Sequence, residues 1–390
     1  MSVVVSAGLS EAADPGRAAA EATSQALAGL GGAPCDLCVM FAGPPYLDDA
    51  ESLLGIVRAG LAPGALIGCG AGGVAGGGRE VEGGGGLAVW ALSAPDAKIE
   101  ARHLITRPAD GAIALGGLPD DADDYGESMI VLAEPTGFSA EALLIHVNDV
   151  RPGMPVLGGL ASAARPGTGA GCLFIDDEVV DNGAAVVSLS GIEVLPCVAQ
   201  GARPVGPEMT VTEAEANVIA ELASQPALER LKQVIGELDA EERELATEGL
   251  LLGIVIDENQ PSYERGDFLV RPVVGVDPAR GAVAIGDRVR VGQTVRLHVR
   301  DADSAGLDLA EALDARVEAV GSAGAAGSLL FTCNGRGANM FGRPDHDAGL
   351  VADAFGAPSA GFFCAGEIGP VGGRNFLHGF TATIAVFPSE

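Results

Sequence analysis

A pattern of strand, helix, strand, glycine-rich turn and further strand occurs three times along this chain of 390 residues. The occurrences span residues 37–92, 129–189 and 328–387. A strand, a helix and a second strand predict a right-handed parallel crossover, and the last strand of each set is expected to pair back beside it. The repetition therefore predicts an α+β fold with mixed sheets built from repeated β-α-β-β units.

Short apolar or β-branched runs and glycine C-caps give the bounds of the repeated elements. The predicted strands are residues 37–41, 65–67, 87–92, 129–133, 155–157, 184–189, 328–332, 361–363 and 381–387. The predicted helices are residues 49–58, 139–147 and 347–355. The glycine-rich turns are expected at residues 68–78, 158–159 and 364–373.

The segment between the second and third occurrences has a different pattern. A capping box at Thr212–Glu215 and apolar residues at helical intervals predict helices that are interrupted at Pro226. Further strands are predicted at residues 250–256, 268–276, 282–285 and 294–299, and a helix at residues 304–320. The composition changes near residues 199–207, which predicts two halves that pack together, residues 30–205 and 206–388.

The charge of the chain excludes several classes of partner. Lys and Arg total 23 against 53 Asp and Glu, a net charge of −30, so no extended basic surface is available for nucleic acid or for an anionic membrane. The longest apolar stretch, residues 61–75, is broken by Gly and Pro and is too short to cross a bilayer. Without an export signal, the seven scattered cysteines are interpreted as reduced thiols of a cytoplasmic protein.

Several segments resemble a known family. The C-terminal third contains LLFTCNGRG from Leu329, SAGFFCAGEIGP from Ser359 and FLHGFTATIAVF from Phe376, and it resembles the C-terminal domain of the FIST family (F-box and intracellular signal transduction). The DLCVMF, GALIGCGAGGVAGGG and GGLAVWAL segments resemble its N-terminal domain. The resemblance implies a sensory module that binds small ligands such as amino acids. The chain has no room for a kinase or an F-box, so any output requires a separate signalling partner.

The loop Cys333-Asn334-Gly335-Arg336-Gly337 is the first candidate ligand site, because it follows a strand whose carboxyl end would line a crevice. Its glycines would let backbone amides approach a ligand, and Arg336 is suited to a bidentate grip on a carboxylate. The alternative is a plain turn in which Arg336 pairs with a neighbouring acid.

The residues Cys364, Gly366 and Glu367 follow the next strand and are expected at the same crevice. Glu367 is suited to a ligand ammonium; alternatively it caps nearby amides or pairs with Arg374. Arg374, Asn375 and His378 fall in the next connection, where they either contact the ligand or satisfy local hydrogen bonds.

A thiol-dependent enzyme is the alternative to a sensor. In that case Cys333 or Cys364 would be the nucleophile and His346 or His378 the base. The other interpretation of these cysteines is that they are buried and unreactive. A third hypothesis is that the protein is a scaffold that has lost its ligand.

Two other motifs provide only weak evidence for a binding site. Gly68-x-Gly70-x-x-Gly73 fits a dinucleotide fingerprint, but the following residues, Val74–Gly78, cannot begin a helix. Cys35-x-x-Cys38 lacks a second ligand pair for zinc. We therefore expect no cofactor, no metal and no catalytic residue, and a small polar metabolite as the ligand.

Overall fold

The structure is a computed structural model that describes residues 3–389 except residues 110, 111, 166, 168, 170 and 264. The chain forms two compact units. The first consists of residues up to 198 together with 309–377 and 381–390, and the second of residues 199–308 and 378–380. The last third of the sequence therefore belongs mostly to the same unit as the first half.

The secondary structure of the first unit is divided among three mixed sheets. Its helices are α1 (Pro15–Gly29), α2 (Ala50–Leu61), α3 (Ala140–Val150), α7 (Ala338–Phe341), α8 (His346–Phe355) and the part of α6 (Ala302–Val320) from residue 309 onward. The strands before the middle of the chain are β1 (Val4–Ser10), β2 (Leu37–Ala42), β3 (Ala65–Gly70), β4 (Gly73–Gly76), β5 (Arg79–Glu82), β6 (Leu87–Ser93), β7 (Lys98–Ala109), β8 (Ala112–Gly116), β9 (Ser128–Ala133) and β10 (Val156–Leu160). The remaining strands are β11 (Leu173–Ile175), β12 (Glu178–Val180), β13 (Ala184–Ser190), β14 (Leu195–Gln200), β22 (Ala325–Cys333), β23 (Ser359–Cys364), β24 (Glu367–Val371), β25 (Arg374–His378) and β26 (Thr381–Pro388).

The predicted repeats are confirmed. Each repeat contributes one parallel pair, β2/β3, β9/β10 or β22/β23, joined by the helix α2, α3 or α8. The last strand of each repeat, β6, β13 or β26, pairs antiparallel beside the first. These units form the α+β fold with mixed sheets that the sequence predicts.

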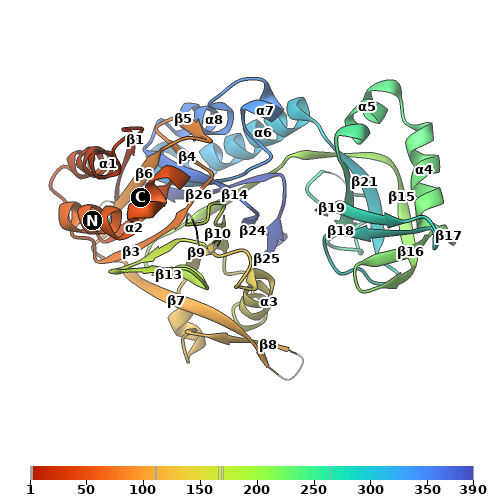
Figure 1. The fold of residues 1–390 in the computed structure, drawn as a ribbon, viewed down its shortest axis with the longest axis horizontal. Coiled ribbons are helices and arrows are strands. Elements are labelled where there is room, and N and C mark those ends of the chain that lie inside the picture. Colours follow the sequence, from red (N-terminus) through yellow and green to blue (C-terminus); the bar gives the residue numbers. More distant parts are fainter. Residues whose placement is uncertain are drawn as a thin grey trace. The chain divides into compact units, whose positions relative to one another are not determined.

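The glycine-rich segments are not simple turns, which corrects the prediction for them. The first and third segments contribute to the hairpins β4–β5 and β24–β25, and the second repeat forms its hairpin, β11–β12, further along the chain at residues 173–180. Each hairpin joins the sheet of a different repeat. The sheet orders are β1-β6-β2-β3-β11-β12, then β25-β24-β10-β9-β13-β7-β8, and β14-β26-β22-β23-β4-β5. Figure 1 shows β5 next to α8, a helix of the third repeat that is far from it in sequence. Gly158 and Gly159 lie inside β10 rather than in a turn.

Equivalent residues of the three sheets meet in one shared core. Val39 and Phe41 of β2, Ile130 and Leu132 of β9, and Leu329 and Phe331 of β22 are all buried within it. The rings of Phe41 and Phe362 stack there with centroids 4.8 Å apart. Side chains alternate along a strand, so the opposite face of each sheet packs against helices. Met40 of β2, for example, packs with Leu53 and Val57 of α2. The repeats are therefore held together by apolar burial that none could supply alone.

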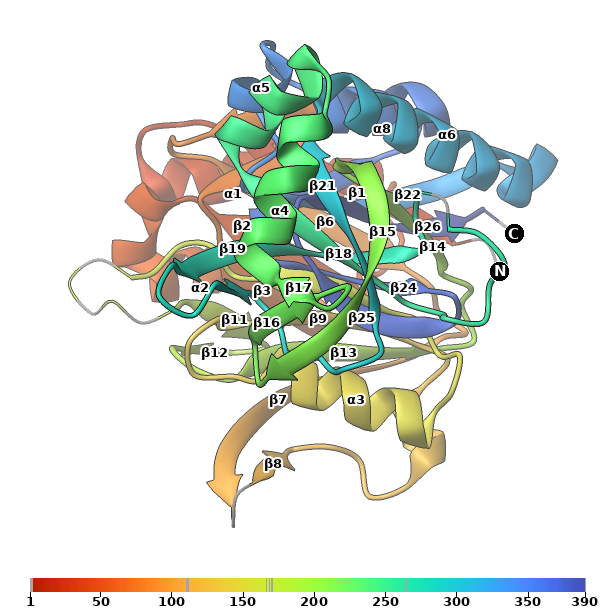
Figure 2. The same ribbon diagram turned by 90° about the vertical axis from the view of Figure 1, so that its right-hand side faces the viewer.

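The second unit is an antiparallel barrel. Its strands are β15 (Ala202–Glu215), β16 (Val218–Leu222), β17 (Gln225–Pro226), β18 (Leu250–Val255), β19 (Phe268–Asp277), β20 (Ala282–Ile285) and β21 (Thr294–Arg300). The order β15-β21-β18-β19-β20-β16 closes because β15 also pairs with β16. Helices α4 (Ala227–Glu237) and α5 (Ala240–Glu248) lie between β17 and β18 in the chain. Helix α4 buries Leu231 and Val234 in the barrel core. Figure 2 shows α4 next to β15 and β16.

The helix predicted over residues 212–222 is wrong, because these residues form the β15–β16 hairpin. Its turn contains Ala216 in the left-handed region at φ 53°. Val211, Ile219 and Leu222 are buried in the barrel core, and this tertiary contact decides against helix. The strands predicted over residues 250–299 and the helix after residue 304 are confirmed. None of the helices within the described residues has the length and apolar content to cross a membrane.

A glycine at the middle of each parallel pair is required by the packing of the backbone. A Cβ on Gly361 of β23 would collide with the carbonyl oxygen of Leu330, and a Cβ on Gly158 of β10 would collide with that of Val131. Both positions face a neighbouring strand rather than a side chain that could move aside, so only glycine fits them.

We predict that Gly361→Ala lowers the free energy of unfolding by at least about 1–3 kcal/mol, the usual cost of overpacking. Gly349→Ala in α8 is the matched control, since a Cβ there meets nothing within 4 Å. It should raise stability by up to about 1 kcal/mol, because alanine favours helix. Urea unfolding of both variants tests the prediction, and equal stabilities would contradict it.

Candidate functional site

The glycine-rich connections of the three repeats converge at the carboxyl ends of the parallel strands. Leu160 of the second repeat accepts a hydrogen bond from the amide of Ala365 at 3.0 Å, and its own amide donates to Gly366 at 2.8 Å. The hydroxyl of Ser162 accepts from the amide of Gly72 at 2.8 Å and donates to the carbonyl of Phe363. One serine therefore ties the first and third repeats to the second. Sequence reasoning did not single out Ser162, and no motif marks it.

The predicted loop lies at this convergence. It begins at Cys333, the last residue of β22, whose register partner in β23 is Cys364. The amide of Asn334 donates to the carbonyl of Cys364 at 2.9 Å, which holds the loop against the end of β23. Gly337 has φ 152°, and a Cβ there would collide with the carboxylate of Glu82. The chain order therefore brings Cys333, Cys364 and the loop glycines together, as the sequence suggests.

Arg336 is 1% exposed and is paired inside the protein. Its Nε lies 2.6 Å from Oδ2 of Asp347 and its Nη2 lies 2.9 Å from Oδ1, a bidentate geometry. Its third nitrogen, Nη1, is buried with no hydrogen-bond partner among the described residues. The guanidinium therefore has two of its nitrogens engaged by an internal carboxylate and one remaining.

Asp347 is the centre of this ion pair. Its carboxylate also accepts from the hydroxyl of Thr332 at 2.6 Å and contacts Nδ1 of His346 at 2.8 Å. Burial would raise its pKa, but the Arg336 charge and these hydrogen bonds hold the pKa well below its usual range. The sequence shows Asp347 only as a neighbour of His346, so its role as the partner of Arg336 required the tertiary structure.

Glu80 of the first repeat caps the helix that carries Asp347. Its carboxylate accepts from the backbone amides of His346, Asp347 and Ala348 at 3.1, 3.0 and 2.9 Å. Burial raises the pKa of Glu80 to about 7, against the effect of these hydrogen bonds. A carboxylate on the β4–β5 hairpin, which belongs to the first repeat, thus stabilises the amino end of α8 in the third repeat.

Glu367 is fully buried beside this ion pair. Its Oε2 accepts from the amide of Thr381 at 3.1 Å, while Oε1 has no hydrogen-bond partner in the described part of the chain. Burial raises its pKa to about 8, although the Thr381 amide, the Cys333 thiol and the Arg336 charge all act to lower it. Glu367 therefore joins Cys333, Cys364 and Arg336 in one cluster, which we call the Arg336–Glu367 cluster.

The position of Glu367 is apolar in the other two repeats. Glu367 pairs with Gly159, just as Leu173 of β11 pairs with Cys69 and Val74 of β4 pairs with Phe362. Leu173 and Val74 belong to the shared core. The third repeat thus places a carboxylate where the other repeats place a hydrocarbon, and burial of this group carries a cost in desolvation.

The remaining predicted residues lie on one strand. Arg374, Asn375 and His378 belong to β25 and not to a connection, which corrects that prediction. Arg374 is exposed, and His378 is buried at the end of the strand. Asn375 bonds to Asn148 at 2.9 Å and to the amide of Val156 at 2.8 Å. These bonds give Asn375 a structural role between α3 and β10.

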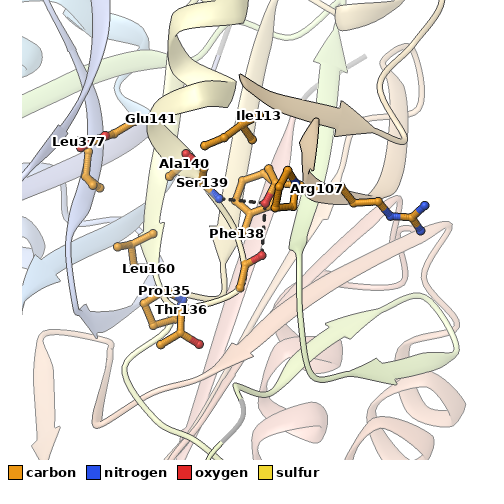
Figure 3. Close-up of a pocket in the computed structure, with 13 residues that line it drawn as sticks. Arg107, Ile113, Pro135, Thr136, Phe138, Ser139, Ala140, Glu141, Leu160 and Leu377 are labelled. Atoms are coloured by element: carbon orange, nitrogen blue, oxygen red, sulfur yellow. Dashed lines mark hydrogen bonds between the residues drawn. The ribbon is translucent and has the colours of Figure 1, made fainter. Parts of the chain in front are cut away.

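A separate cavity of about 450 Å³ opens at the end of β9 and the start of α3 (Figure 3). Its polar side chains bond to the protein itself: the hydroxyl of Thr106 accepts from the amide of Ser139 at 3.2 Å and donates to Gly137 at 3.2 Å. Arg107 extends away from Ser139 at the rim. None of the predicted site residues lines this cavity.

His346 is one of the two bases considered for a thiol-dependent enzyme. His346 bonds to Asp347, and its ring stacks on Phe341 with centroids 3.4 Å apart. The pKa of Cys364 is raised well above its usual range by burial and by Glu367. Cys364 is therefore a poor primary nucleophile near neutral pH. Within the described residues, no group of three or more His, Cys, Asp or Glu is arranged to hold a metal ion.

We predict that Asp347→Ala lowers the free energy of unfolding by about 3–5 kcal/mol, because it leaves the Arg336 charge buried without its partner. The double variant Arg336→Met/Asp347→Leu should recover part of this loss by removing the charge. Urea unfolding of both variants is the measurement. A double variant no more stable than Asp347→Ala would show that the charge is not the source of the cost.

The stability of the protein should also depend on Glu367 ionisation. Folding raises the pKa of Glu367 from 4.5 to about 8, so the folded state holds this proton more tightly than the unfolded chain. Its contribution to stability is present below pH 4.5 and is lost as the pH rises to about 8. Glu367→Gln cannot ionise and should show a smaller loss across this range. Unfolding curves at several pH values test this, and parallel profiles would contradict it.

Comparison with known proteins identifies the family of this chain. Residues 36–225 match the FIST N domain and residues 227–370 match the FIST C domain. The chain is 43% identical over 386 residues to the uncharacterized protein Rv0628c of Mycobacterium tuberculosis, covering 98% of this chain and 99% of that protein. It is 38% identical over 387 residues to the uncharacterized protein Mb0898c of Mycobacterium bovis, covering 99% of each. FIST domains are sensory domains of signal transduction, and this chain belongs to the FIST family.

Proposed function

We propose that this protein is a sensor that binds a small polar metabolite, such as an amino acid, at the Arg336–Glu367 cluster. The observation that carries the proposal is that two buried groups of opposite charge each keep one unpartnered atom among the described residues, Nη1 of Arg336 and Oε1 of Glu367. A buried polar atom without a partner costs free energy, which a ligand that supplies the partner recovers.

The two atoms suit the two ends of a zwitterion. Nη1 is a donor to a ligand carboxylate, and Oε1 is an acceptor for a ligand ammonium. Binding of an ammonium would favour the charged form of Glu367, whose pKa burial raises to about 8. Asp347 keeps the guanidinium in place through its other two nitrogens, so the ligand meets a preorganised donor.

Access to the cluster runs along its loop. Asn334 is exposed, and Cys333 is 8% exposed, whereas Arg336 and Glu367 are deeper. Entry of a ligand would therefore displace the loop of residues 333–337. Such a displacement is a conformational change that a separate signalling partner could detect, in proportion to the differential affinity of the ligand for the two states.

A thermal-shift screen of the full chain against amino acids and small polar metabolites tests the proposal. A ligand at 100 times its Kd adds about 2.7 kcal/mol of stability. Glu367→Gln preserves shape and removes the charge, so it should weaken binding of a hit at least about tenfold, the loss of one charge-assisted hydrogen bond. Arg336→Lys should also weaken binding, since lysine lacks the planar fork.

Two control variants locate the site. Glu134→Gln changes another buried carboxylate, which bonds to Thr136 and Gly137 away from the cluster. Arg107→Gln changes the rim of the separate cavity. Both should bind the hit as the unchanged protein does. Loss of binding in Arg107→Gln alone would move the site to the cavity, and a screen without any hit would overturn the proposal.

A further inference from the structure

Two cysteines occupy the same rung of a parallel strand pair at the edge of the shared core. Cys333 of β22 and Cys364 of β23 are register partners. Neighbouring strands lie about 4.8 Å apart, and register partners project to the same face of the sheet. This spacing falls within the Cα separation of about 4.4–6.8 Å that a disulfide requires, and the two Cβ atoms must approach from about the strand spacing to about 3.5–4.5 Å for the bond to form. Both residues carry thiols in this structure.

The surroundings of the two thiols differ. Sγ of Cys333 accepts a hydrogen bond from the amide of Gly335 at 3.4 Å, and the residue is 8% exposed. The Arg336 charge lies nearby, and the thiol contacts the carboxylate of Glu367. An amide donor and a cation both favour a thiolate, and a carboxylate can accept the thiol proton. Cys364 is fully buried, and its thiol faces the carbonyl of Phe362 at 3.7 Å.

We propose that Cys333 and Cys364 form a reversible redox pair that reacts with hydroperoxides. Glu367 takes the proton of the Cys333 thiol, and the thiolate attacks one peroxide oxygen. The S–O bond forms, the O–O bond breaks, and the leaving oxygen takes the proton from Glu367. The Cys364 thiol then attacks the sulfenic sulfur, so that the S–S bond forms and water leaves with the Cys364 proton. Two thiols and one hydroperoxide give a disulfide, an alcohol or water, and one water.

Each neighbouring group has a defined part in this chemistry. Nη1 of Arg336, which has no partner among the residues described, is available to the peroxide oxygens and to the thiolate. Cys364 acts as the resolving cysteine, and the proton that its thiol loses leaves with the water that forms. The disulfide is neutral, so its burial costs less than that of a thiolate. The reaction also removes the thiol that contacts Glu367, and this would couple oxidation to the cluster.

The surroundings of Cys35 and Cys38 differ from those of Cys333. Cys35 and Cys38 are buried, and burial raises the pKa of Cys35 to about 12 and that of Cys38 well above its usual range. The thiol of Cys35 donates to the backbone carbonyl of Leu37 at 3.3 Å, and burial outweighs the backbone hydrogen bond with Leu92 that acts to lower its pKa. Cys35 therefore serves as an internal control with the same chemistry in an inert setting.

The experiment treats the reduced full chain with hydrogen peroxide, blocks the remaining thiols and digests with trypsin. Cleavage after Arg336 places Cys333 and Cys364 on different peptides, residues 317–336 and 337–374, each with a single cysteine. We expect these peptides to be joined by a bond that dithiothreitol breaks. The chain with Cys364→Ser should stop at a sulfenic acid on Cys333 that dimedone traps.

The matched variants decide the outcome. Cys35→Ser should react as the unchanged chain does, whereas Cys333→Ser should consume peroxide at least about tenfold more slowly, as expected for the loss of the thiol that attacks the peroxide. No ligand is involved in this readout, so its result is separate from that of the metabolite screen. A disulfide between other cysteines, or equal peroxide consumption by Cys333→Ser and Cys35→Ser, would overturn the proposal.

Discussion

The fold of the first unit depends on covering one edge of each parallel strand pair. In a β-α-β crossover, the second strand presents unpaired backbone groups on its outer side, and those groups must be paired where they are buried. Here the pairing comes from a hairpin of another repeat: β11 covers β3, β24 covers β10, and β4 covers β23. Each repeat is completed by another, so none of the three sheets can form from one repeat alone.

This exchange also determines where the candidate site lies. The chain must leave the carboxyl end of each parallel strand and cross to the next sheet, so the three crossings meet at one place. Ser162 and the amide bonds between Leu160 and residues 365–366 hold the crossings together. The same geometry delivers Glu80 to the amino end of α8 and Glu367 to the side of Cys333. Groups distant in sequence thereby become neighbours.

The chemical character of the cluster arises from a departure from the threefold pattern. Where the other hairpins place Val74 and Leu173 in the core, the third hairpin places Glu367. Burying the Glu367 carboxylate alone would cost free energy, and the nearby Arg336 charge reduces that cost. Arg336 is held by Asp347, which in turn bonds to Thr332 and His346. The protein therefore keeps a charged group in its interior within a network that is only partly satisfied, which is the condition on which both proposals rest.

The local elements of the repeats were largely determined by the sequence. Apolar runs of three to five residues bounded by glycine or proline predicted the parallel strands, and the motif around Cys333 to Glu367 pointed to the correct strand ends. The capping box at residues 212–215 misled, because burial of Val211 and Ile219 in the barrel outweighs a local helix signal. Only the tertiary structure decided which sheet each hairpin joins and that Asp347 is the partner of Arg336. Periodicity reports which face of an element is buried, whereas the identity of the neighbour depends on contacts between residues far apart in the chain.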